Sequence, residues 1–315
     1  EEVKSMLEYY EIENSDEVSA DLERLYNGSL FSIEADTRIY NSNMVLYFLS
    51  EYIYRGAYPK KLIDNNIASD YSKIRNIFYL NNSPVHREKL NEIITIGETT
   101  GLITEKYSFE REFTPDDFVS LLFYNGMLTI KGAKAARIEF CIPNYVIKEI
   151  YWNFFASQLK ENIQIALNTD KIITSLEDLA YINNMQGWME RIEDVMELLS
   201  NRDLQKFDEK YVKMLFITLA AMSQLYIIKS EAEIKGEYPD LMYLYRKPYK
   251  PNYQFLIELK YLKKSEAGKL KSTMEAAILQ ARKYLAKPEV GQLENLAVYA
   301  VVFVGKKGHF EEVTE

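Results

Sequence analysis

The C-terminal third of the chain shows the most regular alternation of apolar and polar positions. From about Asp208 to Met222 the apolar residues recur at helical spacing, which predicts a helix with one buried face. The apolar positions are Val212, Leu215, Phe216 and Leu219. Three short runs of β-prone residues follow, at 225–228, 241–245 and 253–260. Gly236, Pro239 and two prolines between 246 and 252 interrupt them, so we expect three separate strands.

Two further elements complete this region. The segment from about Glu266 to Leu285 is rich in Ala, Leu, Lys and Glu, which predicts a second helix. The unbroken apolar run Leu296 to Val304 predicts a strand that is buried on both faces. The predicted order is therefore helix, three strands, helix and strand.

The first 200 residues are predicted to be mostly helical, with one hairpin. We expect helices at 1–10, 116–124, 145–159 and 175–199. Asn125-Gly126 ends the second of these, and Pro143-Asn144 begins the third. The runs 127–130 and 136–142 predict a β-hairpin between them. The sequence predicts a mixed α and β fold, with a boundary at Asn201-Arg202-Asp203 before the C-terminal region.

Two motifs with candidate catalytic residues lie in the second and third predicted C-terminal strands. Pro239-Asp240 opens one strand, and Glu258-Leu259-Lys260 lies in the next. Because side chains alternate along a strand, Glu258 and Lys260 point to one side and Leu259 to the other. If the two strands pair antiparallel, Asp240 and Glu258 converge at one edge of the sheet. Alone, a Pro-Asp pair is typical of a turn and Glu-x-Lys of a solvated face.

Two adjacent carboxylates repel one another unless a cation lies between them. Oxygen ligands with room for water suit Mg²⁺ or Mn²⁺. Such an ion polarises a phosphodiester and activates water. Asp240 and Glu258 are therefore predicted metal ligands, and Lys260 is predicted to orient the water or to stabilise charge on the phosphate.

The next helix adds a third feature. Gln280 and Tyr284 are four residues apart and share a helical face. This pair after Glu-x-Lys, with Gly236 before Asp240, resembles the RecB-like members of the PD-(D/E)XK nuclease superfamily over about the last 110 residues. The resemblance implies an α-β-β-β-α-β core like that of restriction endonucleases. It also implies supporting catalytic roles for Gln280 and Tyr284.

In that superfamily the first core helix usually supplies a further acidic residue. Glu209 is the best match, because it opens the predicted helix at 208–222, and Glu231 at the end of the first strand is the alternative. Each has a simpler interpretation. Glu209 would be a favourable charge at a helix N-terminus, and Glu231 a solvated residue at a strand end.

The N-terminal half carries a second resemblance. Tyr26-Asn27-Gly28 and the segment 40–49 resemble the region downstream of the nucleotide site in a bacterial family of AAA-ATPase-like proteins, whose members commonly end in a PD-(D/E)XK domain. The chain opens on Glu1-Glu2-Val3 without methionine, which indicates a piece of a longer protein. It contains no G-x-x-x-x-G-K-[ST] loop, so we do not predict ATP binding by this chain. The resemblance implies an upstream ATPase module as a partner.

The motif Leu-Leu-x-x-Asn-Gly-x-Leu-Thr at 121–129, followed by a strand and Ile142-Pro143-Asn144, resembles the winged-helix module of related ATPases. Such a module binds DNA or protein, and the acidic surroundings favour a structural or interaction role. The predicted domains are a helical segment at 1–70, a winged-helix-like domain at 71–160, a helical connector at 161–203 and a nuclease-like domain at 204–315.

Composition and charge narrow the function. A single cysteine, Cys141, excludes an internal disulfide framework and fits a reducing cytoplasm. The two histidines, His86 and His309, lack a neighbouring Cys or His, so we expect both on the surface and no zinc site. No apolar run approaches the roughly 20 residues that cross a bilayer, and no signal peptide is apparent.

The net charge of −9 is unevenly distributed. Residues 201–315 hold 19 Lys and Arg against 15 Asp and Glu, a net of +4, whereas the first 200 residues have a net of −13. A lysine cluster follows the proposed catalytic strand and is predicted to contact nucleic acid; it comprises Lys263, Lys264, Lys269 and Lys271. A lysine-rich, solvated helix start is the simpler interpretation.

These features support a metal-dependent DNA nuclease within an ATPase–nuclease protein. The alternative is a catalytically silent nuclease fold that serves as a scaffold, or as a protein- or DNA-interaction module that regulates the ATPase. A winged-helix transcription regulator is a third possibility, and it leaves Asp240, Glu258 and Lys260 unexplained.

Overall fold

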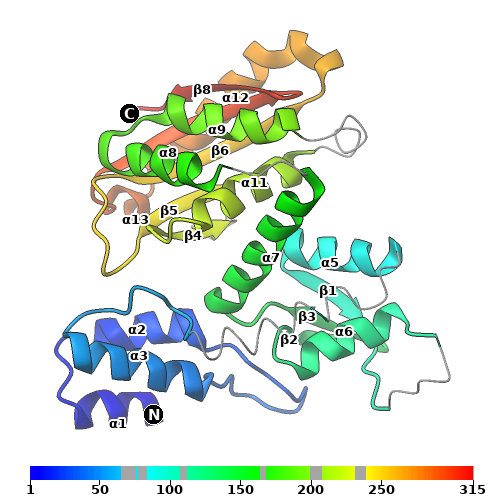
Figure 1. Cartoon of the computed structure of the whole chain (residues 1–315), viewed down its shortest axis with the longest axis vertical. Helices are drawn as coiled ribbons and strands as arrows, with labels where there is room; N and C mark the ends of the chain where they lie inside the picture. Colours follow the sequence, from blue (N-terminus) through cyan, green and yellow to red (C-terminus); the bar gives the residue numbers. More distant parts are fainter. Residues whose placement is uncertain are drawn as a thin grey trace. The chain divides into compact units, whose positions relative to one another are not determined.

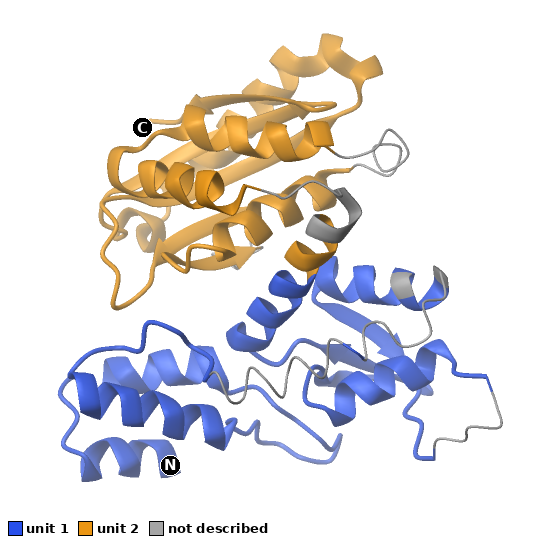
Figure 2. Cartoon of the chain, in the orientation of Figure 1, with its two compact units in different colours: residues 1–154 blue, residues 155–315 orange. Residues whose placement is uncertain are grey.

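The computed structural model describes residues 1–64, 76, 84–106, 112–163, 168–198, 208–230 and 239–314. The chain divides into two compact units, residues 1–154 and residues 155–315 (Figure 2). The predicted division into four segments, with its boundary at 201–203 outside the described residues, stays a prediction. Each unit has its own sheet and its own buried core.

The first unit begins with three helices, α1 (Glu2–Tyr9), α2 (Ser15–Tyr26) and α3 (Ser42–Arg55). Each buries an apolar stripe, as in α2, where Val18, Leu22 and Leu25 face inward. The segment between α2 and α3 turns back on itself through a Ser29–Ile39 bridge and joins the sheet by way of Leu30 and Thr129. Gly28 is required in this segment: its φ is +124°, and a side chain there would collide with the backbone of Pro143.

The sheet of the first unit has the strand order β1-β3-β2 and is antiparallel. Its elements are α5 (Pro84–Ile96), β1 (Glu98–Gly101), α6 (Pro115–Tyr124), β2 (Thr129–Lys134) and β3 (Arg137–Cys141), followed by α7 (Tyr145–Ile163). The predicted hairpin is present as β2 and β3. The structure adds β1, whose four residues Glu-Thr-Thr-Gly carry little apolar signal. The winged-helix assignment stays a prediction.

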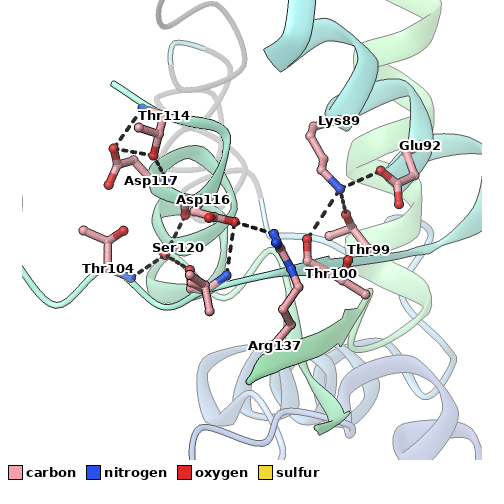
Figure 3. A network of polar contacts seen from close by, with 11 residues as sticks. Lys89, Glu92, Thr99, Thr100, Thr104, Thr114, Asp116, Asp117, Ser120 and Arg137 are labelled. Carbon is pink, nitrogen blue, oxygen red and sulfur yellow. Dashed lines mark hydrogen bonds and ion pairs between the residues drawn. The ribbon is translucent and has the colours of Figure 1, made fainter. Parts of the chain in front are cut away.

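A polar network joins the elements of this sheet (Figure 3). Lys89 of α5 donates to Glu92 and to Thr99 of β1, at 2.9 and 3.0 Å. Asp116 of α6 accepts from Arg137 of β3, at 3.0 Å. These contacts fix helices to strands, and they form no recognisable catalytic arrangement.

The first unit also corrects one prediction. His86 is buried, with 5% of its surface exposed, and its ring packs against Phe113 and Phe118. The aromatic residues that enclose it lie near the start of α6, almost thirty residues further along the chain, so the local sequence gave no sign of its burial. His309 in the second unit is half-buried.

The second unit contains a five-stranded sheet in the order β4-β5-β6-β7-β8. The strands are β4 (Tyr226–Ser230), β5 (Leu241–Tyr245), β6 (Gln254–Leu262), β7 (Leu296–Val304) and β8 (Lys307–Glu312). Only the β6–β7 pair is parallel; the other pairs are antiparallel. β7 lies between β6 and β8 and is buried along most of its length, as its continuous apolar run predicts.

Helices cover both faces of this sheet (Figure 1). They are α8 (Thr169–Ile182), α9 (Met185–Leu198), α11 (Glu209–Ala221), the 3₁₀ turn η1 (Lys264–Lys269), α12 (Leu270–Leu285) and α13 (Pro288–Gly291). On one face, Met274, Ala277 and Tyr284 of α12 pack against strand residues that include Leu256 and Val298. On the other, Phe216 of α11 packs edge-on against Trp188 of α9 and Phe303 of β7. The site residues of β6 are thereby held between two packed layers.

The structure differs from the prediction at one predicted helix and at one strand that was not predicted. The single helix predicted at 175–199 is two helices, because Asn183 adopts a left-handed conformation and Asn184 caps the next helix through Gly187. α8 and α9 also lie in the same compact unit as the sheet. Strand β8 was not predicted: its Lys-Gly-His-Phe-Glu-Glu sequence is largely polar, as suits an edge strand, and it follows a tight turn at Gly305.

Candidate active site

The pairing of β5 with β6 brings the two predicted motifs together. Leu241 lies opposite Ile257 in an antiparallel register, so Asp240, which directly precedes β5, reaches the middle of β6. The Asp240 Oδ2 atom accepts a hydrogen bond from the Leu259 backbone N–H at 2.9 Å. This bond ties the start of one strand to the Glu-Leu-Lys segment of the next. The convergence expected from antiparallel pairing is therefore observed.

Glu258 and Lys260 project from the same side of β6, as the strand periodicity predicts. Lys260 Nζ donates to Glu258 Oε1 at 2.6 Å and lies 3.4 Å from Asp240 Oδ2. Leu259, between them, is fully buried on the other side. The Glu258 side chain is fully buried, that of Asp240 is 12% exposed and that of Lys260 is 26% exposed. Lys260 is thus the most accessible member of the cluster.

The structure adds a residue that the sequence analysis missed. Lys213 of α11 places its Nζ 3.1 Å from Asp240 Oδ1, and its side chain is 10% exposed. Every other residue from Val212 to Ala220 is buried and all but Thr218 are apolar, so Lys213 is the one charged residue of that stretch. A lysine within an otherwise apolar helix segment was a readable signal, because a buried charge needs a partner.

Burial raises the pKa of Glu258 to about 7, with a further contribution from the Asp240 charge and an opposing one from Lys260. Its second oxygen, Oε2, is buried and makes no hydrogen bond to the described residues. A buried carboxylate oxygen without a partner is costly, and a cation or a proton would satisfy it. The site therefore has the capacity for one further positive charge beside Glu258.

The ammonium of Lys260 is held in its charged form. Burial opposes the charge, but the carboxylates of Asp240 and Glu258 outweigh this effect and raise the pKa of Lys260. Lys260 is consequently a permanent cation at physiological pH. It can orient and stabilise negative charge, and it is a poor general base.

Glu209 lies at the first turn of α11, within the electrostatic field of the cluster. Burial raises its pKa, Lys260 lowers it, and Asp240 raises it. Within the described ranges, no three Asp, Glu, His or Cys side chains are grouped closely enough to hold a metal ion. A ligand role for Glu209 stays a prediction. Glu231 and Gly236 lie outside the described residues.

Gln280 and Tyr284 lie on one face of α12, as predicted, and Gln280 Nε2 donates to the Tyr284 hydroxyl at 2.9 Å. Tyr284 is buried in the core between α12 and the sheet. Leu256 and Leu262 of the same core flank Glu258 and Lys260 on β6, so α12 covers the face from which those two residues project. The catalytic roles of Gln280 and Tyr284 stay predictions.

The four predicted nucleic-acid contacts, Lys263, Lys264, Lys269 and Lys271, are all exposed in and around η1, immediately after β6. Lys269 pairs with Glu266 at 2.8 Å, and this bond lowers the pKa of Glu266. Lys271 lines a pocket of about 870 Å³ between α9, α12 and β8, which Asp240, Glu258 and Lys260 do not line. The pocket is therefore separate from the candidate active site.

Residues 207–313 match the family model of the PD-(D/E)XK nuclease superfamily. The match runs from the start of α11 to the end of β8, and it includes Asp240, Glu258 and Lys260. This part of the chain is a PD-(D/E)XK nuclease superfamily domain, and its mixed α and β architecture is consistent with a restriction-endonuclease-like core. No curated protein matches the chain. Among the described helices, none combines the length and the apolar character that a membrane span requires.

Proposed function

We propose that the chain hydrolyses phosphodiester bonds of DNA with a divalent metal ion, Mg²⁺ or Mn²⁺, as part of an ATPase–nuclease protein. The observation that carries the proposal is the convergence of Asp240, Glu258 and Lys260 within a domain of a nuclease superfamily. The unpartnered Oε2 of Glu258 supports a cation beside it. A superfamily fold alone does not establish activity, so the proposal depends on the site.

Asp240 and Glu258 would hold the metal ion, because both offer carboxylate oxygens of the kind that Mg²⁺ and Mn²⁺ prefer. When bound, the ion would polarise the phosphodiester and favour attack by water. Glu258 and Asp240 hold the Lys260 ammonium at a partly exposed position, where it can stabilise the charge that develops on the phosphate. The Leu259 N–H keeps Asp240 oriented toward β6.

The test is cleavage of supercoiled, linear duplex and single-stranded DNA in Mg²⁺ or Mn²⁺, compared with EDTA. We expect cleavage of at least one substrate that requires the metal. Asp240→Asn should lose it, because asparagine can still accept the Leu259 N–H but lacks the negative charge. Thermal unfolding of the variant verifies its fold. Cleavage in EDTA, or full activity of the folded variant, would contradict the proposal.

The exposed lysines around η1 provide a separate prediction about DNA binding. Replacing Lys264 and Lys271 by alanine is expected to weaken DNA binding and to reduce the slope of log K against log salt by roughly 2, since each phosphate contact contributes about 0.9. Binding measured in EDTA at several salt concentrations avoids cleavage. Lys4→Ala, an exposed lysine on α1, is the matched control. An unchanged slope would exclude both lysines from the DNA contact.

One observation favours a catalytically silent scaffold as the second candidate. Lys213 and Lys260 already balance the charges of Asp240 and Glu258 without a metal ion. A scaffold of this kind would bind a partner or regulate an ATPase module. The ATPase partner and the winged-helix module rest on the resemblance of residues 26–28, 40–49 and 121–144 to the ATPase family, and they are part of the proposal.

A further inference from the structure

Asp240 is engaged on both of its carboxylate oxygens. Oδ1 lies 3.1 Å from Lys213 Nζ, and Oδ2 accepts from the Leu259 N–H and lies 3.4 Å from Lys260 Nζ. Glu258 differs, because Oε1 accepts from Lys260 while Oε2 makes no hydrogen bond to the described residues. The two carboxylates therefore face two ammonium groups. Oε2 of Glu258 is the carboxylate oxygen that can still accept a cation or a proton.

We propose that Lys213 is a built-in counter-cation that competes with the divalent metal ion for Asp240 and thereby weakens the metal affinity of the site. The inference rests on the proposed metal site. A doubly charged ion between Asp240 and Glu258 would enter the field of a fixed positive charge only 3.1 Å from one of its ligands. Metal binding therefore requires Lys213 to withdraw from Asp240 or to tolerate the repulsion.

The position of Lys213 separates its role from that of Lys260. Lys260 lies on β6, contacts both carboxylates and is 26% exposed, so it can reach a substrate phosphate. Lys213 lies on α11, contacts the other carboxylate oxygen of Asp240, Oδ1, and is only 10% exposed. Because it acts through Asp240, Lys213 is a positioning residue that controls how readily the site accepts a cation.

A merely structural ion pair would have the opposite effect on metal binding. If Lys213 served only to orient Asp240, its removal would leave that carboxylate less well placed and would weaken metal binding. If it competes with the ion, its removal strengthens metal binding although the apoprotein becomes less stable. The direction of the change in affinity therefore distinguishes the two roles.

The experiment is calorimetric titration of Mn²⁺ into the wild-type chain and into Lys213→Gln, Lys213→Arg and Asp240→Asn. We expect Lys213→Gln to bind Mn²⁺ about tenfold more tightly than the wild type, because one repelling charge is absent. Lys213→Arg keeps the charge and should bind within about twofold of the wild type. Asp240→Asn should lose the binding. Lys213→Met, which keeps the straight aliphatic chain, replaces the glutamine variant if that variant does not fold.

Thermal unfolding gives a second readout. Without metal, Lys213→Gln should melt below the wild type, and saturating Mn²⁺ should raise its melting temperature by more than it raises that of the wild type. Equal or weaker Mn²⁺ binding by folded Lys213→Gln or Lys213→Met would overturn the inference. The inference would also be overturned if Lys213→Arg bound Mn²⁺ more tightly than the wild type by the same factor as Lys213→Gln.

The cleavage assay keeps this inference separate from the proposed function. Metal-dependent cleavage by the wild type, without tighter Mn²⁺ binding by Lys213→Gln or Lys213→Met, would overturn the role of Lys213 alone. Tighter Mn²⁺ binding by Lys213→Gln or Lys213→Met, but not by Lys213→Arg, with no cleavage of any DNA substrate by the wild type, would support the role of Lys213 and overturn the nuclease proposal.

Discussion

Replacement of Lys260 by alanine is expected to slow DNA cleavage by about 10²- to 10³-fold. The Lys260 ammonium lies 2.6 Å from Glu258 Oε1 and 3.4 Å from Asp240 Oδ2, so it is fixed beside the two carboxylates that would hold the metal. Its removal takes away a permanent positive charge from the place where the phosphate becomes more negative. Single-turnover cleavage in saturating Mg²⁺ or Mn²⁺ measures the effect on the chemical step.

Lys283→Ala is the matched control, because it makes the same chemical change at an exposed position on α12. It should cleave at the wild-type rate. Thermal unfolding should show that the Lys260→Ala variant retains its fold, since Asp240 keeps Lys213 and the Leu259 N–H as partners and the buried Glu258 carboxyl, which loses Lys260, can take up a proton or a metal ion. A folded Lys260→Ala variant that cleaves as fast as Lys283→Ala would remove Lys260 from the mechanism.

Glu258→Gln is expected to stabilise the metal-free protein at pH 8, by about 3 kcal/mol relative to the wild type. Burial and the Asp240 charge raise the pKa of Glu258 from 4.5 to about 7. The folded wild type therefore binds more protons than the unfolded chain between these values. This contribution is fully present below pH 4.5, falls as pH rises through 7, and is absent above it. Glutamine is neutral at every pH, so the Glu258→Gln variant does not lose this stability as pH rises.

Urea unfolding of both proteins in EDTA at pH 5, 6, 7 and 8 measures this difference. The free energies of unfolding should be similar at pH 5 and should diverge toward pH 8, with the variant the more stable. Glu275→Gln, an exposed carboxylate on α12, is the control and should follow the wild type. A difference between wild type and Glu258→Gln that stays constant across this range would show that Glu258 is ionised at all four pH values.

Much of the C-terminal domain could be predicted because its elements have strong local patterns. The apolar run of β7, the breakers around β5 and the two-residue period of Glu258 and Lys260 on β6 are all visible in the chain. The elements with weak local patterns were not predicted. β8 is a mostly polar edge strand, and the helix break at Asn183 depends on a left-handed residue that many helices tolerate only at their ends.

One part of the candidate site could be predicted from the sequence, namely that β5 and β6 are neighbours in the sheet. A short loop between two strands favours antiparallel pairing. The local sequence does not place Lys213 beside Asp240. It lies 27 residues before Asp240, on a helix whose rotation about its own axis no local pattern determines, and only the packing of α11 brings its ammonium to Asp240 Oδ1. His86 is a similar case, because Phe113 and Phe118 enclose it from a distant segment.

By itself, the sequence determined the types of the strongly patterned elements of the C-terminal domain and the shared side of Glu258 and Lys260, because both follow from the repeat of the backbone. The tertiary structure alone decided which charges surround the carboxylates and how deeply each is buried. Those two quantities arise from contacts between distant segments, and they set the pKa of Glu258 and the pairing of Asp240 with Lys213. The chemistry proposed for this site depends on both.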